Sequence, residues 1–262
     1  MQNKIFQVDT FTDKIFGGNP ACVVPLKKWL PDEILLKIAS ENAVAETAFF
    51  LDHGTSFPLR WFTPDIEMDL CGHASLATAH VLKTVLKPQQ NTFVFNTLSG
   101  DLIVNHNADL YTLDFPTRVP IPAALPEIIS QALSVQPQFV LKARDYVLVY
   151  EKESDVKNIV INRNILNQIN LDPGGIIITA KGDNSDFVSR FFTSQASLFE
   201  DYVTGSSHCS LIPYWSERLG KKQLMAYQIS DRIGQLFCEN AGSRVLISGK
   251  AITYSEGIFY TE

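Results

Sequence analysis

The amino-acid sequence predicts an α/β (α+β) fold of two similar domains, because one order of elements occurs twice along the chain. A strand at residues 60–63 (RWFT) is followed by a polar loop and a turn at Gly72, which opens an apolar helix. The same order returns with a strand 130 residues later, at 190–193 (RFFT), and a glycine 133 residues later, at Gly205. Repeats of about 20–50 residues are those of solenoids, so so long an offset indicates duplication of a whole domain.

The other elements of the first half follow from periodicity and turn residues. Alternating apolar and polar side chains predict a strand at residues 5–11, and a short apolar run predicts another at 21–25. A proline followed by two acids at 31–33 is typical of a helix start. Strands are expected on both sides of a hairpin turn at 98–100, and again at 111–116, where a proline ends the strand.

The second half repeats this outline. In chain order, the expected elements are a strand at 145–150, a helix-like stretch at 156–169, a strand at 174–179, the 190–193 strand, a helix from about 206 to 219, a hairpin at 228–236 and a strand at 244–248. Between the halves, residues 117–126 contain three prolines, which indicates a linker. We therefore expect an N-terminal domain at 1–117 and a C-terminal domain at 118–262, with the last residues able to pack back on the first domain.

Composition excludes several classes of partner. The 262 residues are 45% hydrophobic and carry a net charge of −6, without the basic stripe that nucleic-acid binding requires. Apolar runs fall short of the ~18 residues of a membrane span. The four cysteines lack C-x-x-C spacing and the first residues resemble a strand rather than a signal peptide, so reduced thiols and a cytoplasmic location are expected.

The two glycine turns are candidate anion sites. A helix start leaves N–H groups unpaired and carries about half a positive charge, and glycine lets a ligand approach them. Gly72 and Gly205 with Ser206 are therefore expected to bind a carboxylate, and two such turns facing one cleft would hold a small acid. The alternative is that each glycine only permits a tight turn into a buried helix.

The residues beside these turns can take part in acid–base chemistry. Cys71 and His73 flank the first glycine, whereas Thr204 and, four residues before Gly205, Asp201 accompany the second. A helix start is expected to lower the pKa of a thiol and to favour a neutral imidazole. The histidines share no ligand spacing with cysteines or aspartates, so no metal site is expected, and phosphate-binding glycine motifs are missing.

Glu46 is a lone carboxylate within a small or apolar segment, residues 42–51. Strand alternation could turn it to solvent, or it could pair with a buried base. A carboxyl group in apolar surroundings has a raised pKa, so it could also serve as an acid or a base near neutral pH.

Taken together, these motifs resemble the phenazine biosynthesis PhzF-like family, within the diaminopimelate epimerase-like fold superfamily. The resemblance rests on residues 16–20 (FGGNP), 45–49 (AETAF), 60–74, 200–208 and 228–234, which span nearly the whole chain. It implies two pseudo-symmetric domains, each with strands wrapped around a central helix, and a cofactor-independent isomerase that is commonly a homodimer.

The resemblance also implies residue roles. Glu46 matches the general acid/base, with His73 and Asp201 assisting, and Gly72, Gly205 and Ser206 match positions that hold a substrate carboxylate. Two positions depart from the family pattern: Ala45 stands where a serine is usual, and Tyr202 where a proline is usual. These departures concern the choice of substrate, which the sequence does not name.

Two other functions remain open. A cysteine-dependent racemase or epimerase needs a cysteine before each glycine; Cys71 satisfies this, but Thr204 occupies the second place. A non-catalytic protein on the same fold could bind a small acid at the helix starts without any chemistry. The presence together of Glu46, His73 and Asp201 favours the enzyme.

Overall fold

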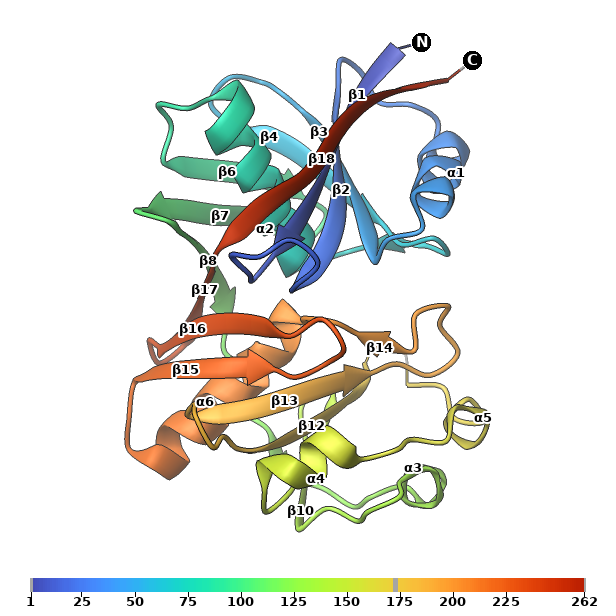
Figure 1. Ribbon diagram of the computed structural model, residues 1–262, viewed down its shortest axis with the longest axis vertical. Coiled ribbons are helices and arrows are strands. Elements are labelled where there is room, and N and C mark those ends of the chain that lie inside the picture. Colours follow the sequence, from blue (N-terminus) through green and yellow to red (C-terminus); the bar gives the residue numbers. More distant parts are fainter. Residues whose placement is uncertain (1, 172–173, 262) are drawn as a thin grey trace. The chain divides into compact units, whose positions relative to one another are not determined.

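The last strand of the chain pairs with the first. β1 (Gln2–Thr10) and β18 (Ala251–Tyr260) form a long antiparallel pair, from Gln2 opposite Tyr260 to Thr10 opposite Ala251 (Figure 1). The computed structural model describes residues 2–171 and 174–261. The chain divides into two units, Met1–Asp114 with Ser248–Glu262, and Phe115–Ile247. The C-terminal strand therefore belongs to the first unit.

The first unit contains most strands of the N-terminal half. Besides β1 and β18, its elements are β2 (Asn19–Leu26), α1 (Asp32–Asn42), β3 (Glu46–Leu51), β4 (Phe57–Phe62), β5 (Glu67–Met68), α2 (Gly72–Val81), the π-helical turn η1 (Leu82–Leu86), β6 (Thr92–Thr97), β7 (Gly100–Asn107) and β8 (Leu110–Pro116), in which the chain passes to the second unit. Every residue of α2 is buried. This helix is made of small and apolar residues on all sides, which is typical of a helix enclosed by other elements.

The second unit has the same kind of plan. Its elements are β9 (Ile121–Pro122), α3 (Glu127–Ala132), β10 (Phe139–Lys142), β11 (Tyr146–Val149), α4 (Glu153–Asn158), α5 (Arg163–Leu166), β12 (Ile176–Lys181), β13 (Phe187–Phe192), β14 (Glu200–Asp201), the 3-10 turn η2 (Gly205–Ser207), α6 (His208–Leu219), β15 (Gln223–Gln228), β16 (Gly234–Asn240) and β17 (Arg244–Gly249), in which the chain returns. Its core joins apolar side chains of α3, α4 and α5 to those of β11, β12 and β13.

Two helix predictions need correction. The stretch expected at 156–169 is two short helices, because α4 ends at Ile159 in an extended conformation and Asn162 caps a new helix. The Asn162 side chain accepts hydrogen bonds from the N–H groups of Asn164 and Ile165. The helix expected from 206 begins as an α-helix at His208, since residues 205–207 form a 3-10 turn.

The two units share one strand register. In the first, β2 pairs parallel with β3, which pairs antiparallel with β4; in the second, β11, β12 and β13 do the same. Thr47 lies opposite Phe62, as Ile176 lies opposite Phe192. One residue earlier on each strand, Glu46 and Gly175 are therefore equivalent positions.

An equivalent ion pair supports this alignment. Arg60 donates to both carboxylate oxygens of Glu67 at 2.6 Å, and Arg190 donates to those of Glu200 at 2.7 and 2.8 Å. Each pair joins the third strand of its set to the short strand that follows. The repeat seen in the sequence is therefore a repeat of structure.

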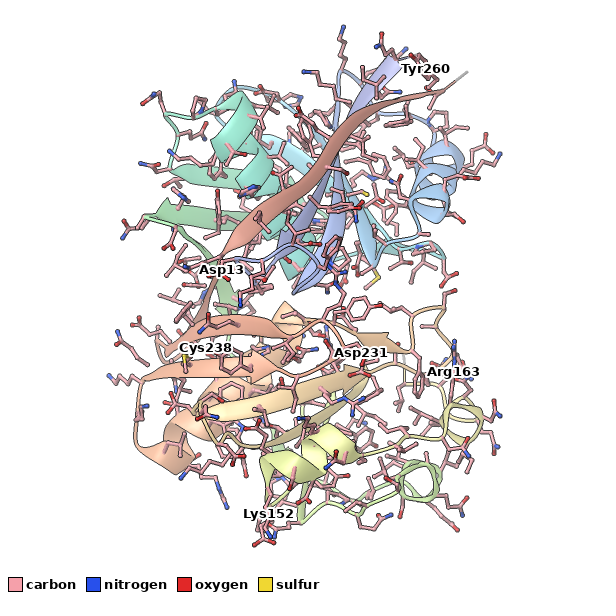
Figure 2. The ribbon with its side chains drawn as sticks, in the orientation of Figure 1. Asp13, Lys152, Arg163, Asp231, Cys238 and Tyr260 are labelled. Atoms are coloured by element: carbon pink, nitrogen blue, oxygen red, sulfur yellow. The ribbon has the colours of Figure 1, made fainter. Side chains whose placement is uncertain are left out.

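Side chains cover both units densely, and Figure 2 shows Tyr260 near the end of β18 and Cys238 on β16. Cys22, Cys71, Cys209 and Cys238 are free thiols. Among the described residues, no helix is both long and apolar enough to cross a membrane.

Candidate active site

Glu46 and His73 form the acid–base pair of the first unit. Glu46 is the first residue of β3 and His73 the second residue of α2. Oε2 of Glu46 lies 3.0 Å from Nε2 of His73, and their side chains are only 15% and 4% exposed. Neither atom has a well-aligned hydrogen bond within residues 2–171 and 174–261, so the contact is one of charge rather than of hydrogen-bond geometry. Of the two structural readings of Glu46, the structure therefore favours pairing with a base.

The other imidazole nitrogen faces two further side chains. Nδ1 of His73 lies 3.3 Å from Nδ2 of Asn19, at the start of β2, and 3.6 Å from Sγ of Cys71. These contacts fix the plane of the ring, so Nε2 remains directed at Glu46. Asn19 belongs to the FGGNP segment, but no feature of that segment indicated a contact with His73.

The electrostatics of this group differ from the expectation. Burial alone would lower the pKa of His73, but its neighbours Cys71 and Glu46 raise it well above the usual 6.5. Burial, with the charge of Glu46, raises the pKa of Cys71. Cys71 is then a neutral thiol near pH 7, and the Glu46 carboxylate is the anion that keeps His73 charged. The prediction of a neutral imidazole and an acidic thiol is wrong, because desolvation and one carboxylate outweigh the helix start.

The same three residues are the nearest approach to a metal site in the described chain. One ligand atom from each of Glu46, Cys71 and His73 lies within 4.8 Å of the others. However, the thiol faces Nδ1 of the ring and the carboxylate faces Nε2. A single ion binds one ring nitrogen, so this arrangement does not suit a shared ion, and the absence of a metal stays a prediction.

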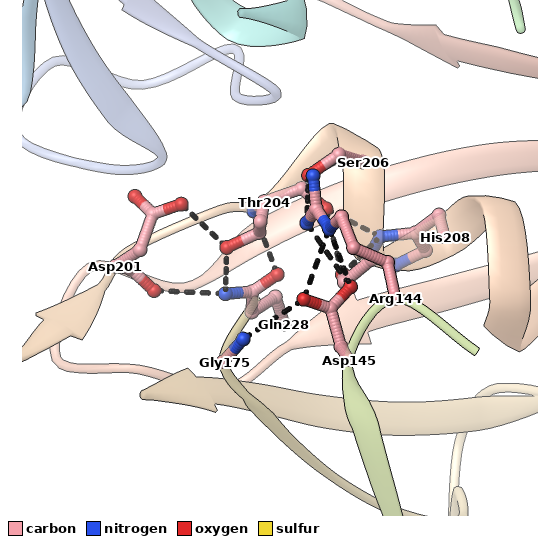
Figure 3. Close-up of polar contacts among 9 residues, drawn as sticks. Arg144, Asp145, Gly175, Asp201, Thr204, Ser206, His208 and Gln228 are labelled. Atoms are coloured by element: carbon pink, nitrogen blue, oxygen red, sulfur yellow. Dashed lines mark hydrogen bonds and ion pairs between the residues drawn. The ribbon is translucent and has the colours of Figure 1, made fainter. Parts of the chain in front are cut away.

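In the second unit, a polar network holds Thr204 and Asp201 (Figure 3). The Thr204 hydroxyl donates to Oδ2 of Asp201. Gln228, which is fully buried, accepts the N–H of Thr204 at 2.8 Å and donates to the carbonyl of Asp201 at 2.8 Å. Gln228 thus fixes the backbone immediately before Gly205. Sequence reasoning gave Gln228 no role, because its partners lie 24 and 27 residues away.

Both glycine turns lead into helices that begin without a side-chain cap. Cys71 and Thr204 occupy the cap positions, and in the described part of the chain neither side chain accepts a helix N–H. Such starts keep N–H groups available to an anion. Gly72 and Gly205 are both buried, whereas Ser206 is partly exposed.

Arg144 and Asp145 complete the second-unit cluster (Figure 3). Arg144 donates from Nε and Nη2 to the carboxylate of Asp145 at 3.0–3.2 Å, and from Nη2 to the Ser206 hydroxyl at 2.9 Å. Asp145 is 1% exposed and also accepts the N–H of Gly175 at 2.9 Å. The sequence analysis missed both residues, although an adjacent Arg-Asp pair before a buried strand was the available signal.

The equivalence of Glu46 and Gly175 makes the two units chemically different. A Cβ atom on Gly175 would lie 2.5 Å from Cζ of Phe191 and 2.7 Å from the carbonyl oxygen of Phe192. No side chain fits there without movement of the backbone. The second unit therefore carries no carboxylate at the position that Glu46 occupies in the first.

Comparison with known proteins gives matches along the whole chain. A family model described as phenazine biosynthesis-like protein (PhzC-PhzF) matches residues 8–257. An uncharacterized isomerase of Pseudomonas aeruginosa is 45% identical over 260 residues, which cover 99% of this chain and 100% of that protein. A crystal structure of a PhzF family phenazine biosynthesis protein from Enterococcus faecalis is 42% identical, with a TM-score of 0.94 and 100% coverage of both chains.

More distant structures are alike in fold alone. A hydroxyproline epimerase from Agrobacterium vitis has a TM-score of 0.60 at 11% identity, over 98% of this chain and 92% of that one. These likenesses confirm the predicted epimerase-like fold of two similar halves. The names of the relatives confirm the predicted enzyme class, an isomerase.

Proposed function

Because this chain belongs to the phenazine biosynthesis-like (PhzC-PhzF) family, we propose that it is a cofactor-independent isomerase that moves a proton within a small carboxylated metabolite. Glu46 is the general acid/base, and His73 and Asp201 assist it. Gly72, Gly205 and Ser206 bind the substrate carboxylate. That both glycine turns hold one substrate stays a prediction.

The proposed role of Glu46 rests on its contact with His73. The Glu46 carboxylate takes a proton from a substrate carbon, and the electron pair of the broken C–H bond passes into the adjacent unsaturated system. The resulting carboxylic acid returns the proton to another carbon of the same molecule. The charged imidazole 3.0 Å away favours the carboxylate form that begins this cycle.

The difference between the units supports a single base. The position of Glu46 is Gly175 in the second unit, and the position of Cys71 is Thr204. One carboxylate that both removes and returns the proton acts on one face of the substrate. A cysteine-dependent racemase lacks this support, because burial raises the pKa of Cys71 and the second unit offers a hydroxyl in its place.

Proton exchange in deuterated water tests the proposal. Unsaturated and 2-substituted small acids are incubated with the wild-type protein and followed by NMR for deuterium at carbon. Glu46→Gln keeps the shape of the side chain and should reduce exchange by about 10²–10⁴-fold, the usual contribution of a general acid/base. Cys71→Ala is the matched control within the same cluster and should retain most activity.

The opposite pattern contradicts the assignment. If Cys71→Ala abolishes exchange and Glu46→Gln retains it, the chemistry belongs to the thiol. If binding of an acid is measurable but no exchange occurs with any candidate, the chain is a non-catalytic acid-binding protein. We further propose, as the resemblance implies, a cytoplasmic homodimer that acts in a biosynthetic process, which light scattering and cell fractionation test.

A further inference from the structure

The second unit contains a cavity of about 260 Å³ beside the turn that joins β10 to β11. Two of its lining side chains, Lys142 and Arg144, carry positive charge, and Tyr146 and Asn170 add polar groups. None of the described lining residues is acidic. Cations that line a cavity without an acid among them attract an anion.

Arg144 is held in place from two sides. Its Nε and Nη2 groups donate to the buried carboxylate of Asp145, and Nη2 also donates to Ser206. Asp145 is itself fixed by the N–H of Gly175. The guanidinium is therefore oriented before any ligand binds, which reduces the entropy lost on binding.

The bonds of Arg144 leave part of the guanidinium available. Nε and Nη2 make all of its hydrogen bonds, so Nη1 has no acceptor in the part of the chain that the structure describes. The Arg144 side chain is 25% exposed. An oxyanion could therefore accept from Nη1 without displacing Asp145.

Lys142 supplies the second charge. Its Nζ lies 4.3 Å from the ring centre of Tyr146 and 3.3 Å from the Tyr146 hydroxyl oxygen. The cation–π contact keeps the ammonium group beside the cavity rather than extended into solvent. Arg144 and Lys142 are two residues apart at one end of the same hairpin.

The cluster adjoins a residue already proposed to bind substrate. Because the Ser206 oxygen accepts from Arg144, its own hydrogen remains available to donate to a carboxylate. Ser206 follows Gly205 as His73 follows Gly72, and Arg144 stands where the first unit has Pro20, next to Asn19. A side chain from the same strand start thus contacts the residue after the glycine in each unit, through Asn19 to His73 and through Arg144 to Ser206.

We propose that this cavity binds a second acidic group of the substrate, a carboxylate or a phosphate, through Arg144 and Lys142. The substrate of the enzyme then carries two acidic groups, one at the glycine turns and one in the cavity. This inference rests on the proposed function for the statement that the ligand is the substrate, but binding itself is measured without turnover.

Calorimetry with matched acids tests the subsite. Succinate and 3-phosphonopropionate each carry a second acidic group, whereas butyrate ends in a methyl group. At constant ionic strength, the wild-type protein should bind at least one of the first two about 10-fold or more tightly than butyrate. The tighter of the two identifies the group as carboxylate or phosphate.

Variants assign the preference to the cavity. Arg144→Gln should remove most of the preference and leave the affinity for butyrate within about 2-fold, and Lys142→Gln should lower the preference in part. Arg218→Gln is the control, since it removes the same charge at the far end of α6 and should change neither affinity. A purely structural role of Arg144 would weaken all three acids equally.

Loss of the cation could unfold the unit by leaving Asp145 buried and unpaired. The double variant Arg144→Gln/Asp145→Asn avoids this, because the asparagine can still accept the N–H of Gly175. It should fold and still lack the preference. Equal or absent binding of the acids by the wild-type protein, or a preference that survives in the folded double variant, overturns the inference.

The two proposals fail in different ways. If the preference depends on Arg144 but Glu46→Gln retains proton exchange, the subsite stands and the assignment of Glu46 falls. If Glu46→Gln abolishes exchange but acids with one and two acidic groups bind alike, the isomerase stands and the subsite falls.

Discussion

Oε2 of Glu46 lies 3.0 Å from Nε2 of His73, at the point where the first strand residue of β3 meets the second residue of α2. This contact makes the stability of the protein depend on the charge of His73. It also gives the acid–base group its polarity, since a fixed cation stands beside the carboxylate.

The first prediction concerns pH dependence at His73. Because its pKa in the folded protein is raised well above 6.5, its stabilisation is fully present below about pH 6.5 and is lost as the pH rises through the folded-state pKa. Urea unfolding of the wild type and His73→Gln should therefore show a larger difference in unfolding free energy at pH 6 than at pH 9. His53→Gln, at an exposed position, is the control; a difference that grows with pH contradicts the prediction.

The second prediction concerns acid at His80. Burial, with the charge of His106, lowers the pKa of His80 to about 4. Its contribution to stability is present above about pH 6.5 and is lost as the pH falls toward 4, by up to about 1.4 kcal/mol per pH unit. His80→Gln should show a shallower loss of unfolding free energy between pH 6.5 and 4. An unchanged slope would mean that other groups, such as the buried His208, dominate the acid response.

The third prediction concerns the ion pair of Arg190 and Glu200. Arg190 also donates to the carbonyl oxygens of Val156 and Ile159, each at 3.2 Å. Arg190→Ala leaves these oxygens and a carboxylate that is 19% exposed without a donor, and should cost about 2–4 kcal/mol in urea unfolding.

An exposed ion pair in the other unit is the control for Arg190. Lys87 and Asp52 lie 2.9 Å apart with side chains 34% and 41% exposed. Lys87→Ala should cost no more than about 1 kcal/mol, because water already solvates both charges. Equal costs at Arg190 and Lys87 contradict the argument from burial.

The fourth prediction concerns glycine at the position equivalent to Glu46. Gly175→Ala places a Cβ atom 2.5 Å from Cζ of Phe191 and should cost about 1–3 kcal/mol in thermal or urea unfolding. Gly257→Ala on β18 is the matched control, since its nearest neighbour, Cγ2 of Ile5, is 3.9 Å away. That change should be neutral or stabilise by up to about 1 kcal/mol. A neutral Gly175→Ala would remove the steric reason for the missing second carboxylate.

Much of the fold was predictable because its signals are local. Strand alternation, the proline and acids at 31–33 and the two glycine turns each act within a few residues, and the repeated order of elements carried them from one half to the other. The same signals failed at 156–169, where the Asn162 cap divides one apolar pattern into two helices.

By itself, then, the sequence determined the repeated halves, the two glycine turns and the isolation of Glu46 among apolar residues. Only the tertiary structure decided what those residues meet. β18 pairs with β1 across almost the whole chain, Glu46 meets His73, and Arg144 meets Ser206 at a separation of 62 residues. Strand register and burial set these contacts, and burial together with neighbouring charge sets the pKa values of Cys71 and His73, so no short segment of sequence contains them.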